Sequence, residues 1–269
     1  MTSPLLTRAA AARIAAFDDG RLLAGIAQDR LTLLHDGRDG RRAEIALPSA
    51  GTALAWSALS RRLFVATGSG VVVVDGDRVR GTAVDRSVIA MSMFDDGRYL
   101  LALHADARLS VLDAATLQVR QAVDVVAGGN RIALTGTFAY VHAPTTAQAT
   151  MLALADLRQG KAAPVQIATG APGSRADDAA AIDTLMQPLP EDNGVLVANP
   201  IDGHVYQYAE GMLAPVGSFS NYRRRAVALL TVPAGFEAQG EGRYRGVVRH
   251  RRGGAYQLVV SGVSPRFAA

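Results

Sequence analysis

The sequence predicts an all-β fold built from a repeated unit of about 40 residues, and three observations lead to this expectation. The pentapeptide FDDGR occurs twice, at Phe17–Arg21 and Phe94–Arg98. The two copies begin 77 residues apart, which is twice a period of about 38. Each copy is followed by two short apolar runs separated by a polar turn, a pattern typical of paired strands.

Five such units can be recognised in chain order. They are LLAGIAQDRLTLLHDG (22–37), SRRLFVATGSGVVVVDGD (60–77), YLLALHADARLSVLDA (99–114), GTFAYVHAPTTAQATMLALAD (136–156) and DNGVLVANPIDGHVYQYAEG (192–211). In the second unit, Ser60–Arg62 takes the turn, Leu63–Ala66 forms one strand and Val71–Val74 the next. We expect the FDDGR segments to be inter-strand turns, with exposed Asp and Arg and with Phe17 and Phe94 buried at equivalent positions.

A period near 40 with short strands indicates the blades of a β-propeller rather than a helical solenoid. One blade cannot bury both of its faces alone, so the blades must pack side by side. We therefore expect a propeller portion over 1–222, with an insertion near 160–190 in which 176–186 forms a short helix. Residues 223–269 are expected to form a short β-sandwich-like segment, with strand candidates in RAVALLTV, GRYRGVVRH and AYQLVVSG.

The composition limits the function classes. The 269 residues are 49% hydrophobic and 19% charged, which suits a folded chain with a substantial core. The absence of Cys excludes disulfides, thiolate metal sites and a Cys nucleophile. No apolar run is long enough for a transmembrane helix, and the N-terminus does not have the pattern of a signal peptide. A complete chain of this kind would be cytoplasmic.

The charge is unevenly distributed along the chain. Residues 221–269 contain nine Arg and two Glu, a net charge of +7, whereas the other 220 residues carry a net charge of −3. A basic end can favour an acidic partner, a membrane surface or nucleic acid. Exposed arginines on strands explain the pattern more simply. We therefore expect no nucleic-acid binding, and we keep an acidic protein partner as a possibility for this segment.

Catalytic motifs are absent from the sequence. The five histidines are far apart, and the HExxH, GxSxG and GxxxxGK[ST] patterns do not occur. His104 and His142 follow apolar strand residues and are the candidates for a site on the propeller axis, although a structural role is the simpler interpretation. The paired Asp residues of FDDGR are interpreted as turn residues. We expect no catalytic residue, no bound metal and no cofactor.

The segment HVYQYAEGMLAPVGSFSNYRRR (204–225) differs in composition from the rest of the chain. We interpret it as a structured connector between the propeller and the C-terminal segment, with Tyr206, Tyr208, Met212 and Phe219 buried and the arginines solvated. The alternative is a ligand site, either a metal site or an Arg cluster for an acidic group. The candidate binding or connector residues are His204, Tyr206, Tyr208, Glu210, Met212, Asn221, Tyr222, Arg223, Arg224 and Arg225.

The unit FDDGRYLLALHADARLSVLDAATLQVRQAVDV resembles the blades of the YVTN-type propellers of bacteria, which are relatives of the cytochrome d1 and amine-dehydrogenase heavy-chain propellers. The resemblance covers about residues 10–215. It implies seven blades, of which about five are recognisable here. It also implies a periplasmic, non-catalytic binding or scaffold protein of an exported, redox-associated system, with another protein as its partner. The alternative that it implies is a propeller subunit of a d1-haem or quinoprotein dehydrogenase.

Overall fold

The chain divides into two compact units in a computed structural model, residues 1–231 and 232–269. The described residues are 13–18, 21–35, 42–84, 86–172, 185–189, 193–220, 222, 226, 229–231, 237–240, 243–245, 261–263 and 266–268. Among them, no helix is long and apolar enough to cross a membrane.

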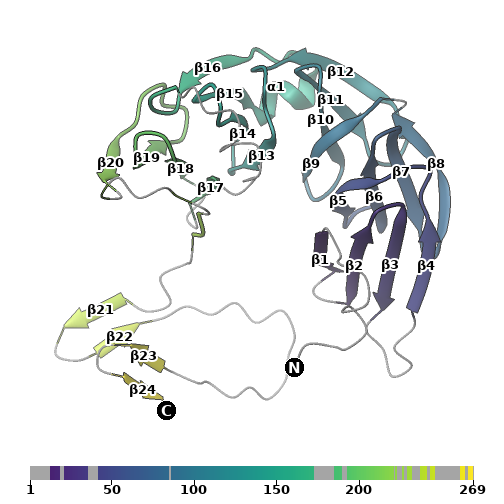
Figure 1. The fold of residues 1–269 in the computed structure, drawn as a ribbon, viewed down its shortest axis with the longest axis horizontal. Coiled ribbons are helices and arrows are strands. Elements are labelled where there is room, and N and C mark those ends of the chain that lie inside the picture. Colours follow the sequence, from purple (N-terminus) through teal and green to yellow (C-terminus); the bar gives the residue numbers. More distant parts are fainter. Residues whose placement is uncertain are drawn as a thin grey trace. The chain divides into compact units, whose positions relative to one another are not determined.

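Five antiparallel sheets of four strands each make up the first unit (Figure 1). Sheet 1 contains β1 (Arg13–Phe17), β2 (Leu22–Ala27), β3 (Arg30–His35) and β4 (Arg42–Ala46). Sheet 2 contains β5 (Gly51–Ser57), β6 (Arg62–Thr67), β7 (Gly70–Asp75) and β8 (Arg78–Val84). Sheet 3 contains β9 (Val88–Phe94), β10 (Tyr99–His104), β11 (Arg108–Asp113) and β12 (Val119–Asp124).

The remaining two sheets repeat the same plan. Sheet 4 contains β13 (Arg131–Leu134), β14 (Phe138–Ala143), β15 (Gln148–Ala153) and β16 (Val165–Ala168). Sheet 5 contains β17 (Met186–Pro188), β18 (Gly194–Asn199), β19 (His204–Ala209) and β20 (Gly217–Ser220). Within every sheet the strands follow one another in chain order, so each sheet is a meander. The repeated unit deduced from FDDGR is therefore one four-stranded sheet.

The FDDGR segments are inter-strand turns, as predicted. The first joins β1 to β2 and the second joins β9 to β10. Asp18 and Asp95 take the same place in the two turns and have positive φ values of 52° and 56°. Asp and Asn are among the few non-Gly residue types that adopt this conformation at modest cost. Phe94 is buried, whereas the equivalent Phe17 is only half-buried.

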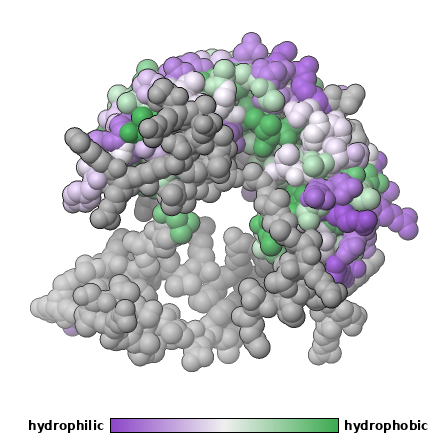
Figure 2. Space-filling model, viewed as in Figure 1, coloured by the Kyte–Doolittle hydropathy of each residue, from purple (hydrophilic) through white to green (hydrophobic). Residues whose placement is uncertain are grey.

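Consecutive sheets pack face to face through apolar side chains. One cluster joins sheets 1 and 2 through residues such as Ile26 and Val72, and a second joins sheets 2 and 3 through Phe64 and Leu100. Two further clusters join sheet 3 to sheet 4 and sheet 4 to sheet 5. The first strands β1, β5, β9, β13 and β17 contact one another in turn. The side viewed in Figure 2 carries hydrophilic residues around the outer strand β12.

Two sequence expectations about the insertion near 160–190 need correction. Val165–Ala168 is β16, which pairs with β15 and completes sheet 4. Met186, expected at the end of a helix, begins β17 of sheet 5. Residues 176–184 of the expected helix lie outside the described residues. Among the described residues, the chain forms the helix α1 (Leu154–Gln159), which buries Leu154 and Leu157 against sheets 3 and 4.

The second unit contains two hairpins in its described part. Strand β21 (Glu237–Gly240) pairs with β22 (Arg243–Arg245), and β23 (Ser261–Val263) pairs with β24 (Arg266–Ala268). The strand expected in RAVALLTV is wrong for its described residues, because Ala226 and 229–231 lie outside any strand. The β-sandwich assignment stays a prediction.

Candidate functional site

The segment 204–220 is part of sheet 5 and not a connector. Strand β19 is the third strand of this sheet, and β20 pairs with it from Gly217 opposite Gln207 to Ser220 opposite His204. The connector interpretation is therefore wrong for this stretch. Gly211 and Pro215 lie in the loop between the two strands, and the chain returns to the same sheet after the loop.

The predicted site residues on β19 face sheet 4. Tyr208 is 1% exposed, packs in the cluster between sheets 4 and 5, and donates its hydroxyl to the carbonyl oxygen of Ala168. Burial, followed by the negative charge of Asp202, raises the pKa of the Tyr208 hydroxyl. The expectation that Tyr208 is buried is confirmed. Its role is to hold the two sheets together.

Tyr206 and His204 both bind the turn that precedes them. The Tyr206 hydroxyl donates to Oδ2 of Asp202 at 2.8 Å, and the backbone N–H of His204 donates to Oδ1 of Asp202 at 2.9 Å. Burial and then the hydrogen bond to Asp202 raise the pKa of Tyr206 to about 12. The same carboxylate accepts from the N–H of Ala171 at 3.0 Å. The Asp202 carboxylate is therefore occupied by hydrogen bonds from neighbouring residues of the protein itself.

Glu210 connects sheet 5 to sheet 4. Its Oε1 atom accepts hydrogen bonds from the Thr135 hydroxyl and from the backbone N–H of Thr137, the latter at 2.9 Å. Burial alone would raise the pKa of this carboxyl, but the hydrogen bonds from the two threonines outweigh it, and the net pKa is lowered. Among the described residues, no three His, Asp or Glu side chains are grouped as metal ligands.

Met212 and Phe219 are exposed, contrary to the sequence expectation. Their exposed fractions are 48% and 56%, and Tyr222 is 86% exposed. The reason is the register, because Phe219 lies opposite Val205 on the face of sheet 5 that points away from sheet 4. Asn221 and Arg223–Arg225 lie outside the described residues. Tyr222 is the one member of the 221–225 group that the structure describes.

Several exposed apolar side chains lie on β20 and in the loop before it, and together we call them the outer hairpin surface. It consists of Met212, Leu213, Val216 and Phe219, each about half exposed or more. Leu196 and Val205, both half-buried, lie on the same face of the sheet as Phe219, as the pairing of β18, β19 and β20 shows. The composition of this segment distinguishes it in the sequence, but two of these side chains, Met212 and Phe219, were expected to be buried.

The outer edge of sheet 5 differs from the outer edges of the first three sheets. The fourth strand of each sheet has no partner on its outer side among the described strands. Strands β4, β8 and β12 carry exposed charged residues, including Arg42, Arg80 and Arg120. Charges on an edge strand discourage pairing with another chain. Strand β20 has the sequence GSFS, without a charge and with an exposed Phe219.

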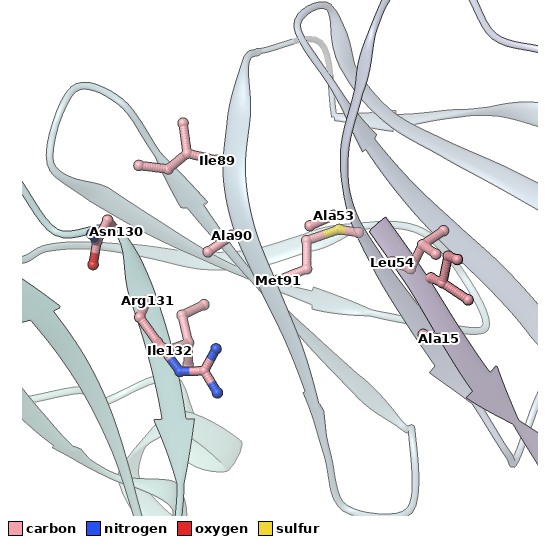
Figure 3. A pocket seen from close by; sticks show the side chains of 10 residues that line it. Ala15, Ala53, Leu54, Ile89, Ala90, Met91, Asn130, Arg131 and Ile132 are labelled. Carbon is pink, nitrogen blue, oxygen red and sulfur yellow. The ribbon is translucent and has the colours of Figure 1, made fainter. Parts of the chain in front are cut away.

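A second feature is a cleft between the first strands of four sheets, lined by both apolar and polar groups (Figure 3). Its volume is about 290 Å³, and Met91 of β9 lies at its centre near Ala53 of β5. Arg131 supplies its one charged lining residue, and Arg131 Nε donates to the carbonyl oxygen of Met186 at 3.3 Å. Such a cleft can accept an apolar side chain. Sequence reasoning missed it because its walls come from strands about 40 residues apart.

The two histidines that the sequence suggested for a site on the propeller axis are both buried. His104 is buried, and its Nδ1–H donates to the carbonyl oxygen of Ser87 at 2.9 Å, while Nε2 lies 2.8 Å from the Ser110 hydroxyl. His104 is thus held within sheet 3. His142 is also buried, and burial followed by the positive charge of Arg131 lowers its pKa to about 4.

The five packed four-stranded meanders define a β-propeller fold. No model of a known protein family matches the chain, and no curated protein matches it. Solved structures do match. The β-propeller domain of Cps50 (Swd1) from Myceliophteria thermophila is similar with a TM-score of 0.58 and 16% identity, over 79% of this chain and 73% of that chain. A chain of the mitotic checkpoint complex has a TM-score of 0.61 and 14% identity, over 81% of this chain and 67% of that chain. The similar structures are propellers of WD40 type, and at these identities the likeness shows the fold.

Proposed function

We propose that this protein is a propeller-type scaffold that binds a protein partner and does not catalyse a reaction. The observation that carries the proposal is the outer hairpin surface. Half-exposed apolar side chains on an uncharged edge strand and in the loop before it are typical of an interaction site. The mitotic checkpoint complex, to which the fold is similar, is by name a multi-component assembly, which agrees with this class of function.

The partner is an extended segment of another protein that adds a strand to β20. The outer N–H and C=O groups of β20 are available for pairing, because no described strand covers them. Phe219 and Val205 provide apolar contacts on one face of the sheet, so the added strand should carry an apolar residue at alternate positions. Backbone pairing would give affinity, and the contact with Phe219 would give selectivity.

Two narrower parts of the proposal rest on the sequence. The blade sequence at 94–125 supports a relationship to the YVTN-type propellers, and with it a place in an exported, redox-associated system. The net charge of +7 over 221–269 supports an acidic region on the partner. If that region contributes, the affinity should fall steeply as salt rises from low to physiological ionic strength.

The test compares the proteins that co-purify with three forms of the chain from its native host. These are the parent, Phe219→Asp in β20 and Val119→Asp in β12. Val119 is a matched control because it is 49% exposed on an edge strand that already carries charges. We expect a partner that is recovered equally by the parent and Val119→Asp, and at least about tenfold less by Phe219→Asp, since a charge placed in an apolar contact is costly.

The co-purification experiment can also contradict the proposal. A partner recovered in equal amounts with all three forms would bind elsewhere, and the outer hairpin surface would lose its assigned role. Equal thermal unfolding of the three proteins is the control for folding. Phe219 and Val119 are both exposed, so neither substitution should change stability by more than about 0.5 kcal/mol.

A further inference from the structure

A cavity of about 510 Å³ lies between sheets 1 and 2, away from sheet 5. Its volume falls within the range of small-molecule pockets. The side chains that line it come from the ends of β1, β3, β5 and β7 and from the starts of β2 and β6. Its apolar lining residues are Leu22, Leu33, Leu63 and Val74, and its polar lining residues are Asp18, Arg21, His35, Trp56, Ser60, Arg61 and Asp75. We call it the Trp56 cavity.

Two polar atoms of residues that line this cavity have no hydrogen-bond partner. They are the indole Nε1 of Trp56 and the hydroxyl Oγ of Ser60, and both atoms are buried. A buried donor without a partner costs free energy, so folded proteins rarely leave one unpaired without a reason. The Trp56 ring stacks on Phe17, with ring centroids 6.5 Å apart. Two unpaired donors at one cavity indicate that an acceptor belongs there.

The charges around the cavity indicate the sign of that acceptor. Asp18 is paired with Arg61, with Oδ2 and Nη2 3.0 Å apart, and Asp75 lies 3.3 Å from Arg80. Arg21 lines the cavity and has no carboxylate partner among the described residues. The positive charge of Arg21 and the two neutral donors of Trp56 and Ser60 are therefore available, whereas the acidic groups are already paired with arginines. A carboxylate can pair with the arginine and accept hydrogen bonds from both donors.

The equivalent place between sheets 3 and 4 is filled by the protein itself. Phe94 and Tyr99 correspond to Phe17 and Leu22, and the helix α1 packs Leu154 and Leu157 against them. Arg158 of this helix pairs with Asp95 at 2.9 Å, as Arg61 pairs with Asp18. Sheets 1 and 2 also have an Asp–Arg pair, although Arg61 comes from the turn between β5 and β6, and no helix lies between β7 and β8 to fill the space. The two junctions therefore differ in how this space is filled.

We propose that the Trp56 cavity binds a small organic acid with an apolar body. The carboxylate accepts hydrogen bonds from the Trp56 indole and the Ser60 hydroxyl and pairs with Arg21. The body of the ligand contacts Leu33, Leu63 and Val74. Short rotations of Trp56 and Ser60 bring their donors to the ligand, because both atoms are covered when the cavity holds no acceptor.

The single tryptophan of the chain makes this site directly observable. The probe is 4-phenylbutyrate, and its uncharged counterpart is 4-phenylbutan-1-ol. The full chain, labelled with ¹⁵N, gives one indole N–H signal. On titration with the acid we expect this signal to move downfield and to saturate, since the N–H gains a hydrogen-bond acceptor. The alcohol should bind at least about tenfold more weakly.

Four variants locate the binding. Ser60→Ala, Arg21→Gln and Trp56→Phe should each raise the dissociation constant of the acid by about tenfold, measured by calorimetry. Arg86→Gln is the control, because Arg86 is similarly exposed but lines a different cavity. Ser60→Ala should leave thermal stability unchanged or raised, since it removes an unpaired buried hydroxyl. A result without saturable binding at millimolar acid, or with equal affinity in all variants, would overturn the proposal.

Discussion

The Ser57 hydroxyl donates a hydrogen bond to the carbonyl oxygen of Gly97 across 2.6 Å, which joins the end of β5 in sheet 2 to the FDDGR turn of sheet 3. Gly97 has a φ of 87°, and a Cβ atom added to it would lie 2.7 Å from the Cα of Ser57. The glycine of the repeated motif therefore has two functions at this position. It adopts a left-handed conformation, and it lets the turn approach the neighbouring sheet.

Gly97→Ala should lower the free energy of unfolding by about 2–3 kcal/mol, because backbone strain and a steric clash add together. Gly76→Ala is the matched control. Gly76 also has a positive φ, of 60°, but an added Cβ there would meet nothing within 4 Å. This control should cost only about 1 kcal/mol. Urea denaturation measures both, and an equal cost for the two changes would refute the close approach at Gly97.

The two aromatic residues of sheet 5 should respond differently to truncation. Tyr208→Ala should cost about 3–5 kcal/mol, since Tyr208 is buried between sheets 4 and 5. Phe219→Ala should change the free energy of unfolding by less than about 0.5 kcal/mol because its ring is exposed. Tyr208→Phe should cost about 1 kcal/mol through the lost bond to Ala168. A large loss of stability in Phe219→Ala would mean that Phe219 is buried, as the connector interpretation expected.

Glu210 should stabilise the contact between sheets 4 and 5. Glu210→Ala removes the acceptor for Thr135 and Thr137 and should cost about 1–3 kcal/mol, whereas Glu210→Gln keeps a neutral acceptor and should cost less. The lowered pKa of Glu210 means that its stabilisation is present above the ordinary value of 4.5 and is lost as the pH falls through the folded pKa. Denaturation of the parent and of Glu210→Gln at pH 7 and pH 3 tests this. If the free energy of unfolding falls by the same amount between the two pH values in both proteins, the assignment to Glu210 is contradicted.

His142 should make the fold sensitive to mild acid. Its pKa is about 4 in the folded protein, and the unfolded chain has a value of about 6.5. The unfolded state therefore binds a proton at a higher pH, and stability falls as the pH decreases from about 6.5 toward 4. The loss between pH 7 and pH 5 should be about 2 kcal/mol. In His142→Leu this part of the pH dependence should disappear, and its persistence would assign it to another group.

The repeats could be predicted because every unit contains the same local signals. Two short apolar runs around a polar turn, together with FDDGR, determined the strand pairs and the period of the sheets. The segment 204–222 was misplaced because Gly211 and Pro215 predict a break but do not say where the chain goes next. A loop that returns to its own sheet and a connector to another module have the same composition.

The cavities and surfaces depend on contacts between repeats, which local patterns do not encode. Trp56 and Arg21 are 35 positions apart in the sequence, and only the packing of sheet 1 on sheet 2 brings them to one cavity. The helix α1 was missed because six residues are too few for a helical period. Its C-terminal Gly160, with a φ of 71°, was the signal that could have revealed it.

The most direct test of the central claim is site-specific photo-crosslinking in the native host. A photoreactive phenylalanine analogue replaces Phe219 in one strain and Val119 in another, both exposed positions on edge strands. The account predicts a discrete crosslinked species with position 219 that is absent with position 119, and a partner segment of extended, alternately apolar sequence at the crosslink. The same crosslinked partner from both positions, or no partner from position 219, would contradict a docking role for the outer hairpin surface.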